Sequence, residues 1–218
     1  MGNSTSLFNT VSFEESGLDL EEFQMAESLM LHQSMVFYMD IIAALQEHLP
    51  SYHQLEILDV GARTGAGANL LGYTYSSNSY SRIKANVTAL DIEDRFVAYA
   101  EKKFPWISSY IVQDIAKLDQ AWDVVVCSHT IEHVANYKDF VHQLRLRAKK
   151  FVVLLAPYDE AHCKLIKGLE MCEGHINSID HGAIAEFEPI FLRIYRSLVW
   201  HQSLAFLALV PGLAIGNG

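Results

Sequence analysis

Three glycines and an acidic side chain stand close together between Glu56 and Gly67. An apolar run ends in Asp59, and Gly61, Gly65 and Gly67 follow it. Glycine has no Cβ, so the backbone can pass close to a ligand there or adopt a positive φ angle at little cost. A strand, a tight loop and a helix start, in that order, form the place where an α/β sheet presents a ligand. The segment therefore predicts a ligand-binding loop.

The sequence of this segment does not match either of two common phosphate-binding motifs. The dinucleotide fingerprint needs G-x-G-x-x-G, but counted from Gly61 the second and third glycine positions hold Arg63 and Ala66. The chain also has no Gly-Lys-Ser/Thr sequence of a P-loop. A carboxylate at the strand end, Asp59, repels a pyrophosphate and suits a cationic group.

Acidic residues also end two later apolar runs. Val87–Leu90 is followed by Asp91, and Ser109–Gln113 is followed by Asp114. An acidic side chain at the end of the second strand can accept hydrogen bonds from the two hydroxyls of a ribose. Asp91 is therefore a candidate ribose ligand.

A second set of reactive side chains follows the apolar run Trp122–Ser128. His129, Glu132 and His133 lie in one short segment, and His175 comes after the next apolar run. Histidine titrates near neutral pH and is the commonest general base. We single out His133 and His175 as candidate catalytic residues. The alternative is structural, with His133 at a helix start and His175 capping a helix.

Strand and helix patterns alternate around these residues, which predicts a parallel sheet covered by helices. An N-terminal helical stretch of residues 20–49 ends at Pro50, and further helices are expected over 137–149 and 160–171. Two more apolar runs near the C-terminus indicate an antiparallel pair. The expected strands cover residues 55–60, 86–91, 109–113, 122–127, 150–156, 190–195 and 204–210.

In this order the motifs resemble those of the class I S-adenosylmethionine-dependent methyltransferases. Asp59, Gly61 and Gly65 match the family's Asp-hydrophobic-Gly-x-Gly-x-Gly loop, and Arg63 replaces its middle glycine. Asp91 matches the acidic residue of the second motif. The resemblance implies an α/β, Rossmann-like, doubly wound and mostly parallel seven-stranded sheet, with a C-terminal antiparallel hairpin and an N-terminal helical cap.

The resemblance also implies a cofactor and a reaction. The cofactor is S-adenosyl-L-methionine, and the reaction is methyl transfer to a small-molecule or sugar-like acceptor, at oxygen. The two alternatives are a non-catalytic protein that binds the same cofactor, which Arg63 favours, and a nucleotide-linked reductase. The implied cofactor contacts are Asp59, Gly61, Ala62, Arg63, Gly65, Asp91, Ile92, Asp114, Ile115, Ser128 and His129.

We expect one domain overall, made of a flexible N-terminus (1–18), a helical cap (19–50) and a methyltransferase domain (51–218). A chain of 218 residues can bury a sizeable core. The oligomeric state stays open, with a dimer as one alternative.

Charge and cysteine content bound the partners. The formal net charge of −10 repels phosphate backbones, so we expect no nucleic-acid partner. The few cysteines indicate a reduced, cytoplasmic protein.

Cys163 and Cys172, with His162 and His175 nearby, match no zinc spacing, so we expect no metal. The C-terminal apolar stretch 198–215 is interrupted by polar residues, so we expect no membrane span.

Overall fold

The computed structural model describes residues 6–49, 51–160, 174–197 and 201–208, apart from the side chains of His53 and His201. The chain divides into two compact units, the first up to Leu118 and the second beginning at Asp119. The predicted helix over 160–171, Cys163 and Cys172 lie almost wholly or wholly outside the described residues.

The first unit is built on three parallel strands, β1 (Tyr52–Val60), β2 (Ile83–Asp91) and β3 (Ser109–Val112), in the order β3-β2-β1. Most apolar residues of β1 and β2 are buried, as in strands covered by helices, whereas β3 at the end of the strand order is more exposed. Asp59 pairs in register with Ala89, and Asp91 pairs with Val112. The carboxyl ends of β1 and β2 therefore meet at one edge of the sheet.

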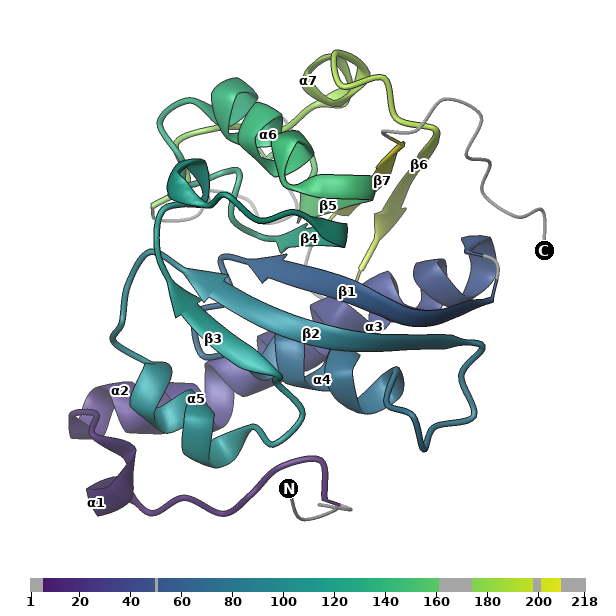
Figure 1. Ribbon diagram of the computed structural model, residues 1–218. Coiled ribbons are helices and arrows are strands. Elements are labelled where there is room, and N and C mark those ends of the chain that lie inside the picture. Colours follow the sequence, from purple (N-terminus) through teal and green to yellow (C-terminus); the bar gives the residue numbers. More distant parts are fainter. Residues whose placement is uncertain (1–5, 50, 161–173, 198–200, 209–218) are drawn as a thin grey trace. The chain divides into compact units, whose positions relative to one another are not determined.

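Helices cover one face of these strands (Figure 1). The first unit contains α1 (Phe13–Ser16), α2 (Leu20–Met25), a π-helical turn η1 (Ala26–Met30), α3 (Leu31–His48), α4 (Ala66–Thr74), α5 (Val97–Lys103) and a 3₁₀ turn η2 (Ile115–Lys117). The predicted N-terminal helical stretch is thus confirmed, and α3 packs against α4.

The stretch Leu20–His48 is long and apolar enough to cross a membrane, judged by length and composition alone. Within its most apolar window 39% is buried inside the protein. Core helices of globular proteins meet the same criterion, so this is weak support for a membrane span.

The expectation of a flexible N-terminus over residues 1–18 stays a prediction, but the described part of this segment forms a short helix and specific contacts. The α1 helix begins with a capping box formed by Ser12 and Glu15. Asn9 donates backbone and side-chain hydrogen bonds to the carbonyl oxygens of Lys103 and Lys102, at 2.9 and 2.8 Å. Val11 is buried in a cluster with residues of α5. The polar composition concealed the buried residues Val11 and Leu18 and several hydrogen bonds that hold the segment on α5.

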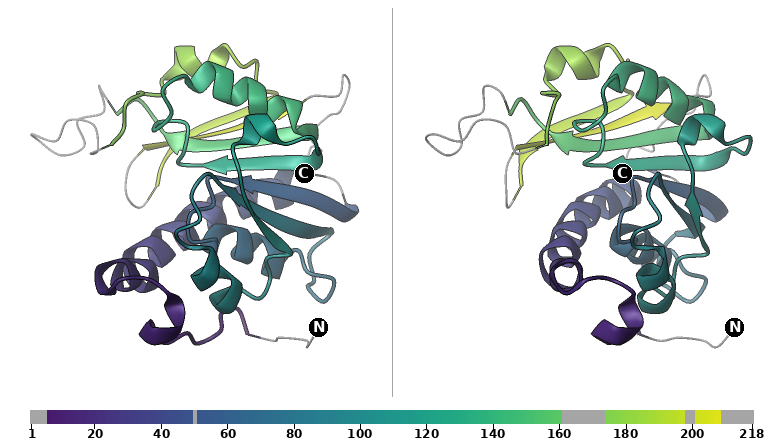
Figure 2. Two further views of the ribbon diagram at one scale, coloured as in Figure 1. Left: turned by 60° about the vertical axis from the view of Figure 1, so that its left-hand side comes forward. Right: turned by 90° about the vertical axis from the view of Figure 1, so that its left-hand side faces the viewer.

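The second unit contains β4 (Trp122–Ser128), α6 (Tyr137–Leu146), β5 (Ala148–Pro157), α7 (His181–Ala185), β6 (Phe191–Arg196) and β7 (His201–Ala208). The strand order is β4-β5-β7-β6, with β4 and β5 parallel and β7 antiparallel to both β5 and β6. Figure 2 shows α6 lying over these strands, where its Val141 and Leu144 are buried.

The predicted fold class is confirmed. All seven expected strands are present, the C-terminal pair is antiparallel, and helices alternate with the parallel strands. This is the Rossmann-like α/β architecture. Several strands begin earlier than the apolar runs predict, because polar residues at their ends still join the backbone ladder.

Candidate active site

The loop after β1 takes the conformation for which its glycines are suited. Gly61 and Gly65 have φ angles of 75° and 85°. The backbone N–H groups of Gly61 and Ala62 both donate to the Leu90 carbonyl oxygen, at 2.9 and 3.0 Å. A Cβ on Gly65 would lie 2.7 Å from the Ile107 side chain. The loop is therefore held against the end of β2, and Gly65 is required both by its angle and by its neighbours.

Arg63 occupies the position where the family has a glycine. Its φ angle is 50°, in the left-handed region, and its side chain is exposed. The backbone therefore keeps a glycine-like course, and the long side chain leaves the loop surface. Arginine at this position therefore strains the loop backbone, but its side chain does not fill the space next to the loop.

Asp91 is tied directly to this loop. Its Oδ2 accepts a hydrogen bond from the Arg63 backbone N–H at 2.7 Å, and its Oδ1 accepts one from Glu93 N–H at 3.2 Å. The carboxylate of β2 thus faces the glycine loop of β1. Each oxygen keeps a second lone pair for a ligand hydroxyl.

Asp59 is fully buried at the end of β1. Its Oδ1 accepts a hydrogen bond from the Tyr38 hydroxyl of α3 at 2.5 Å. Its Oδ2 has no hydrogen-bond partner among the described residues. Burial raises the pKa of Asp59 to about 7; the Tyr38 hydrogen bond opposes this rise and the charge of Asp91 adds to it.

Tyr110 of β3 also contacts the glycine loop. Its hydroxyl donates a hydrogen bond to the Arg63 carbonyl oxygen. Burial raises the Tyr110 pKa, and the nearby carboxylates of Asp91 and Asp59 raise it further. Tyr38 and Tyr110 were not among the predicted site residues, because no local sequence pattern links either side chain to the glycine loop.

The remaining predicted cofactor residues of this unit have different environments. The Asp114 side chain accepts a hydrogen bond from the Ala116 backbone N–H at 2.9 Å and so caps η2. Ile115 is buried, whereas Ile92 is 71% exposed. Ile92 therefore offers an apolar surface next to Asp91, while Asp114 has a structural role whether or not it meets a ligand.

In the second unit, the structure brings the two predicted catalytic histidines together. The rings of His133 and His175 lie 4.6 Å apart in a T-shaped arrangement. His133 Nδ1 is 3.0 Å from the Gly174 carbonyl oxygen, and His175 Nδ1 is 2.5 Å from Glu160 Oε2. His175 does not cap a helix, because α7 begins later with Asp180 as its cap.

Glu132 lies beside the two histidines, and its side chain is buried. Burial raises the pKa of Glu132 to about 7, although its own backbone N–H and His175 oppose the rise. Burial alone would lower the pKa of His175, but the hydrogen bond and charge of Glu160 more than offset this and the pKa is raised. The ionisation of Glu132 and that of His175 therefore depend on each other and on the Glu160 charge.

Ser128 and His129, predicted cofactor contacts, also belong to the second unit. Ser128 Oγ lies 3.0 Å from His129 Nδ1. Burial lowers the pKa of His129 to about 3; a hydrogen bond with Gln202 opposes this effect, whereas His175 and His133 add to it. The His129 imidazole is neutral at physiological pH and borders the Glu132 cluster.

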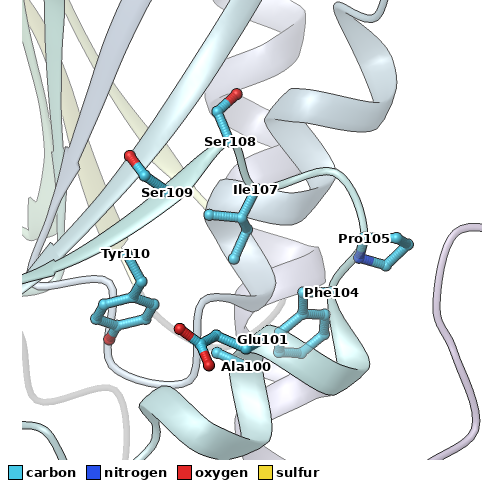
Figure 3. A pocket seen from close by; sticks show the side chains of 8 residues that line it. All are labelled: Ala100, Glu101, Phe104, Pro105, Ile107, Ser108, Ser109 and Tyr110. Carbon is cyan, nitrogen blue, oxygen red and sulfur yellow. The ribbon is translucent and has the colours of Figure 1, made fainter. Parts of the chain in front are cut away.

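A cavity of about 240 Å³ lies in the first unit between α5 and β3 (Figure 3). Phe104, Ile107 and Tyr110 line it, and none of the glycine-loop residues does. It is smaller than the roughly 300–1,000 Å³ of usual ligand pockets. The predicted cofactor residues therefore do not coincide with this cavity.

Comparison with known proteins agrees with this geometry. Residues 58–150 match the family model described as a methyltransferase domain. Over 112 residues the chain is 32% identical to the ubiquinone biosynthesis O-methyltransferase of Rickettsia bellii (strain OSU 85-389). This alignment covers 50% of the chain and 44% of that relative, so the chain matches less than half of the relative's length.

Solved structures share the fold at low sequence identity. Magnesium protoporphyrin IX methyltransferase from Synechocystis PCC 6803, with bound SAH, has a TM-score of 0.58 at 15% identity, over 93% of this chain and 90% of that one. A SAM-dependent methyltransferase from Aquifex aeolicus has a TM-score of 0.56 at 14% identity, over 81% and 92%. The fold is that of the class I methyltransferases. The family model matches less than half of the chain, so the comparisons show this fold and a methyltransferase-like segment over residues 58–150.

Proposed function

We propose that this protein transfers the methyl group of S-adenosylmethionine to an oxygen atom of a small-molecule acceptor. The observation that carries the proposal is the hydrogen bond from the Arg63 backbone N–H to Asp91, which sets an acidic side chain against the glycine loop. In such a site Asp91 accepts hydrogen bonds from the ribose hydroxyls, and the loop backbone approaches the amino-acid end of the cofactor.

The chemistry is a nucleophilic displacement. A lone pair of the acceptor oxygen forms the new C–O bond, and the S–CH₃ bond breaks with its electron pair remaining on sulfur. The hydroxyl proton must pass to a base. His133 and His175 are our candidates for proton transfer, with Glu132 beside them.

Oxygen is the favoured acceptor atom for two reasons. The relatives matched by half of the chain are named as O-methyltransferases, and a hydroxyl acceptor needs the acid–base groups that the second unit supplies. The net charge of −10 disfavours a nucleic-acid substrate. A cytoplasmic location remains part of the proposal, supported by the low cysteine content.

Calorimetry with S-adenosylhomocysteine tests the cofactor. We expect a dissociation constant in the micromolar range, about −8 kcal/mol, and no comparable binding of NADH. Tight NADH binding without a response to S-adenosylhomocysteine would favour the reductase alternative and contradict the proposal.

An acceptor screen with hydroxylated aromatic compounds and sugars tests the reaction. Replacing the base, by His133→Ala or His175→Ala, should lower turnover by about 10²–10⁴-fold and leave S-adenosylhomocysteine binding intact. Binding of the cofactor without transfer to any acceptor would support the non-catalytic alternative, which the Arg63 substitution favours.

A further inference from the structure

The second unit holds an arrangement of ligating atoms that proton transfer alone does not explain. Glu132, His133 and His175 each offer one carboxylate oxygen or ring nitrogen, and these atoms all lie within 4.8 Å of one another. Around a tetrahedral ion with bonds of about 2.1 Å, ligand atoms are separated by about 3.4 Å. The three atoms already lie near this spacing, and the side chains would have to move inward to bind one ion.

Both histidines have the tautomer that a metal requires. Carbonyl and carboxylate oxygens can only accept hydrogen bonds, so Nδ1 of His133 carries a hydrogen for Gly174 and Nδ1 of His175 carries one for Glu160. In the neutral rings Nε2 then keeps its lone pair. A carboxylate or carbonyl behind a ligating histidine is the usual support of a metal site.

Glu132 is the strongest sign of a missing positive partner. The residue is 1% exposed, and neither carboxylate oxygen has a hydrogen-bond partner within the described parts of the chain. A buried carboxylate without donors is costly unless a cation or a proton compensates it. Here it lies beside two nitrogen lone pairs, a combination that attracts a metal ion.

Backbone contacts hold the cluster rigid. The N–H groups of Ile176 and Asn177 both donate to the Glu132 carbonyl oxygen, at 2.8 and 3.1 Å. The Asn177 side chain donates to the carbonyl oxygens of Ile131 and Val134, at 3.1 and 2.7 Å. The segment with Glu132 and His133 is thus fastened to the segment with His175, as a preformed site requires.

We propose that Glu132, His133 and His175 bind a divalent first-row transition ion such as zinc. Two imidazoles and one carboxylate suit such an ion, whereas magnesium and calcium prefer oxygen ligands. Three protein ligands leave a coordination position open for a further oxygen. This role rests on the proposed function: the open position would take the acceptor hydroxyl and stabilise its oxyanion, and the hydroxyl proton would pass to solvent water, because ring nitrogens bound to the ion cannot also accept it. The site uses no cysteine, which is why a search for zinc spacings missed it.

Titration of chelator-treated protein with zinc chloride, followed by calorimetry, tests the site. We expect one ion per chain with a micromolar or lower dissociation constant, and a much weaker response to magnesium. The isosteric Glu132→Gln variant and the His133→Ala variant should each weaken zinc binding at least tenfold. Glu160→Gln, which removes only the support of His175, should weaken it about 10–100-fold. The exposed α6 residue His142 provides the control, and His142→Ala should bind zinc like the wild type.

Failure of this inference can be separated from failure of the proposed function. S-adenosylhomocysteine binding is measured on the same chelator-treated protein and on each variant, with circular dichroism to confirm folding. Cofactor binding without zinc binding, or equal zinc loss in His142→Ala, overturns the metal site alone. Zinc binding without cofactor binding overturns the methyltransferase proposal alone. Once an acceptor is known, transfer should fall at least tenfold with chelator and recover with zinc; an unchanged rate overturns the acceptor role.

Discussion

At the scale of single residues, Asp91 has two tasks, since its carboxylate anchors the glycine loop and faces the expected ribose. Asp91→Ala removes charge-assisted hydrogen bonds that contribute about 1.5–3 kcal/mol each. We expect affinity for S-adenosylhomocysteine, measured by calorimetry, to fall at least tenfold while the fold survives. Asp94→Ala, at an exposed neighbouring position, is the matched control. Unchanged affinity in the Asp91 variant would mean that Asp91 only fastens the loop.

Arg63 is the residue at which the family motif is broken. Arg63→Gly relieves the strain of a left-handed φ, about 1–2 kcal/mol, but it also adds freedom to the unfolded chain. We expect the free energy of unfolding in urea to change by less than about 1 kcal/mol, with cofactor binding retained or improved. Arg63→Ala separates the loss of the side chain from the gain of backbone freedom. If both variants lost binding, the guanidinium would be a direct cofactor contact.

Asp59 should make the stability of the cofactor-free protein depend on pH. Its pKa rises from an ordinary 3.8 to about 7 in the folded state. The folded protein therefore holds this proton more tightly than the unfolded chain. The stabilising contribution is present below pH 4 and is lost as pH rises from about 4 through 7, up to about 4 kcal/mol.

The neutral isostere Asp59→Asn removes this dependence. The variant should gain stability over the wild type as pH increases from 5 to 8, measured by urea unfolding at each pH. The comparison cancels the contributions of all other titrating groups. A difference that does not vary with pH would show that Asp59 is ionised throughout.

At the scale of elements, the contact between α3 and α4 supports the loop from behind. Gly67 lies in the first turn of α4, and a Cβ there would approach the Tyr38 ring to 2.2 Å. Gly67→Ala should force the two helices apart or move Tyr38 from Asp59, with a loss of about 1–3 kcal/mol in unfolding free energy. The same substitution in a Tyr38→Leu background should cost less. Equal costs in both backgrounds would contradict this packing account.

At the scale of the whole molecule, the two units carry different candidate sites, and hydrogen exchange can distinguish their ligands. S-adenosylhomocysteine should slow exchange in residues 61–66 and 91–93, because it orders the loop backbone there. Zinc should slow exchange around residues 131–134 and 174–177. Mass spectrometry of peptides from the complete chain measures both. If either ligand slowed exchange only in other segments, its binding site would lie in those segments instead.

Much of the fold was predictable because its signals are local. An apolar run ending in a carboxylate marks a buried parallel strand and its end, and glycines mark the turn that follows. Asp59, Gly61, Gly65 and Asp91 could therefore be selected, and the structure brings the loop and Asp91 together as expected. The same local reasoning did not indicate the short helix within residues 6–18 or the contacts of this segment with α5, because composition does not reveal such contacts.

The amino-acid sequence by itself determined the alternation of strands and helices, the glycine loop, and the family that its motifs resemble. Only the tertiary structure decided which distant side chains meet. Tyr38 reaches Asp59 from α3, and Glu160 orients His175 beside Glu132, although these residues are far apart in the chain. Such pairs are set by how elements pack, and packing contacts carry no periodicity or spacing that a single sequence displays.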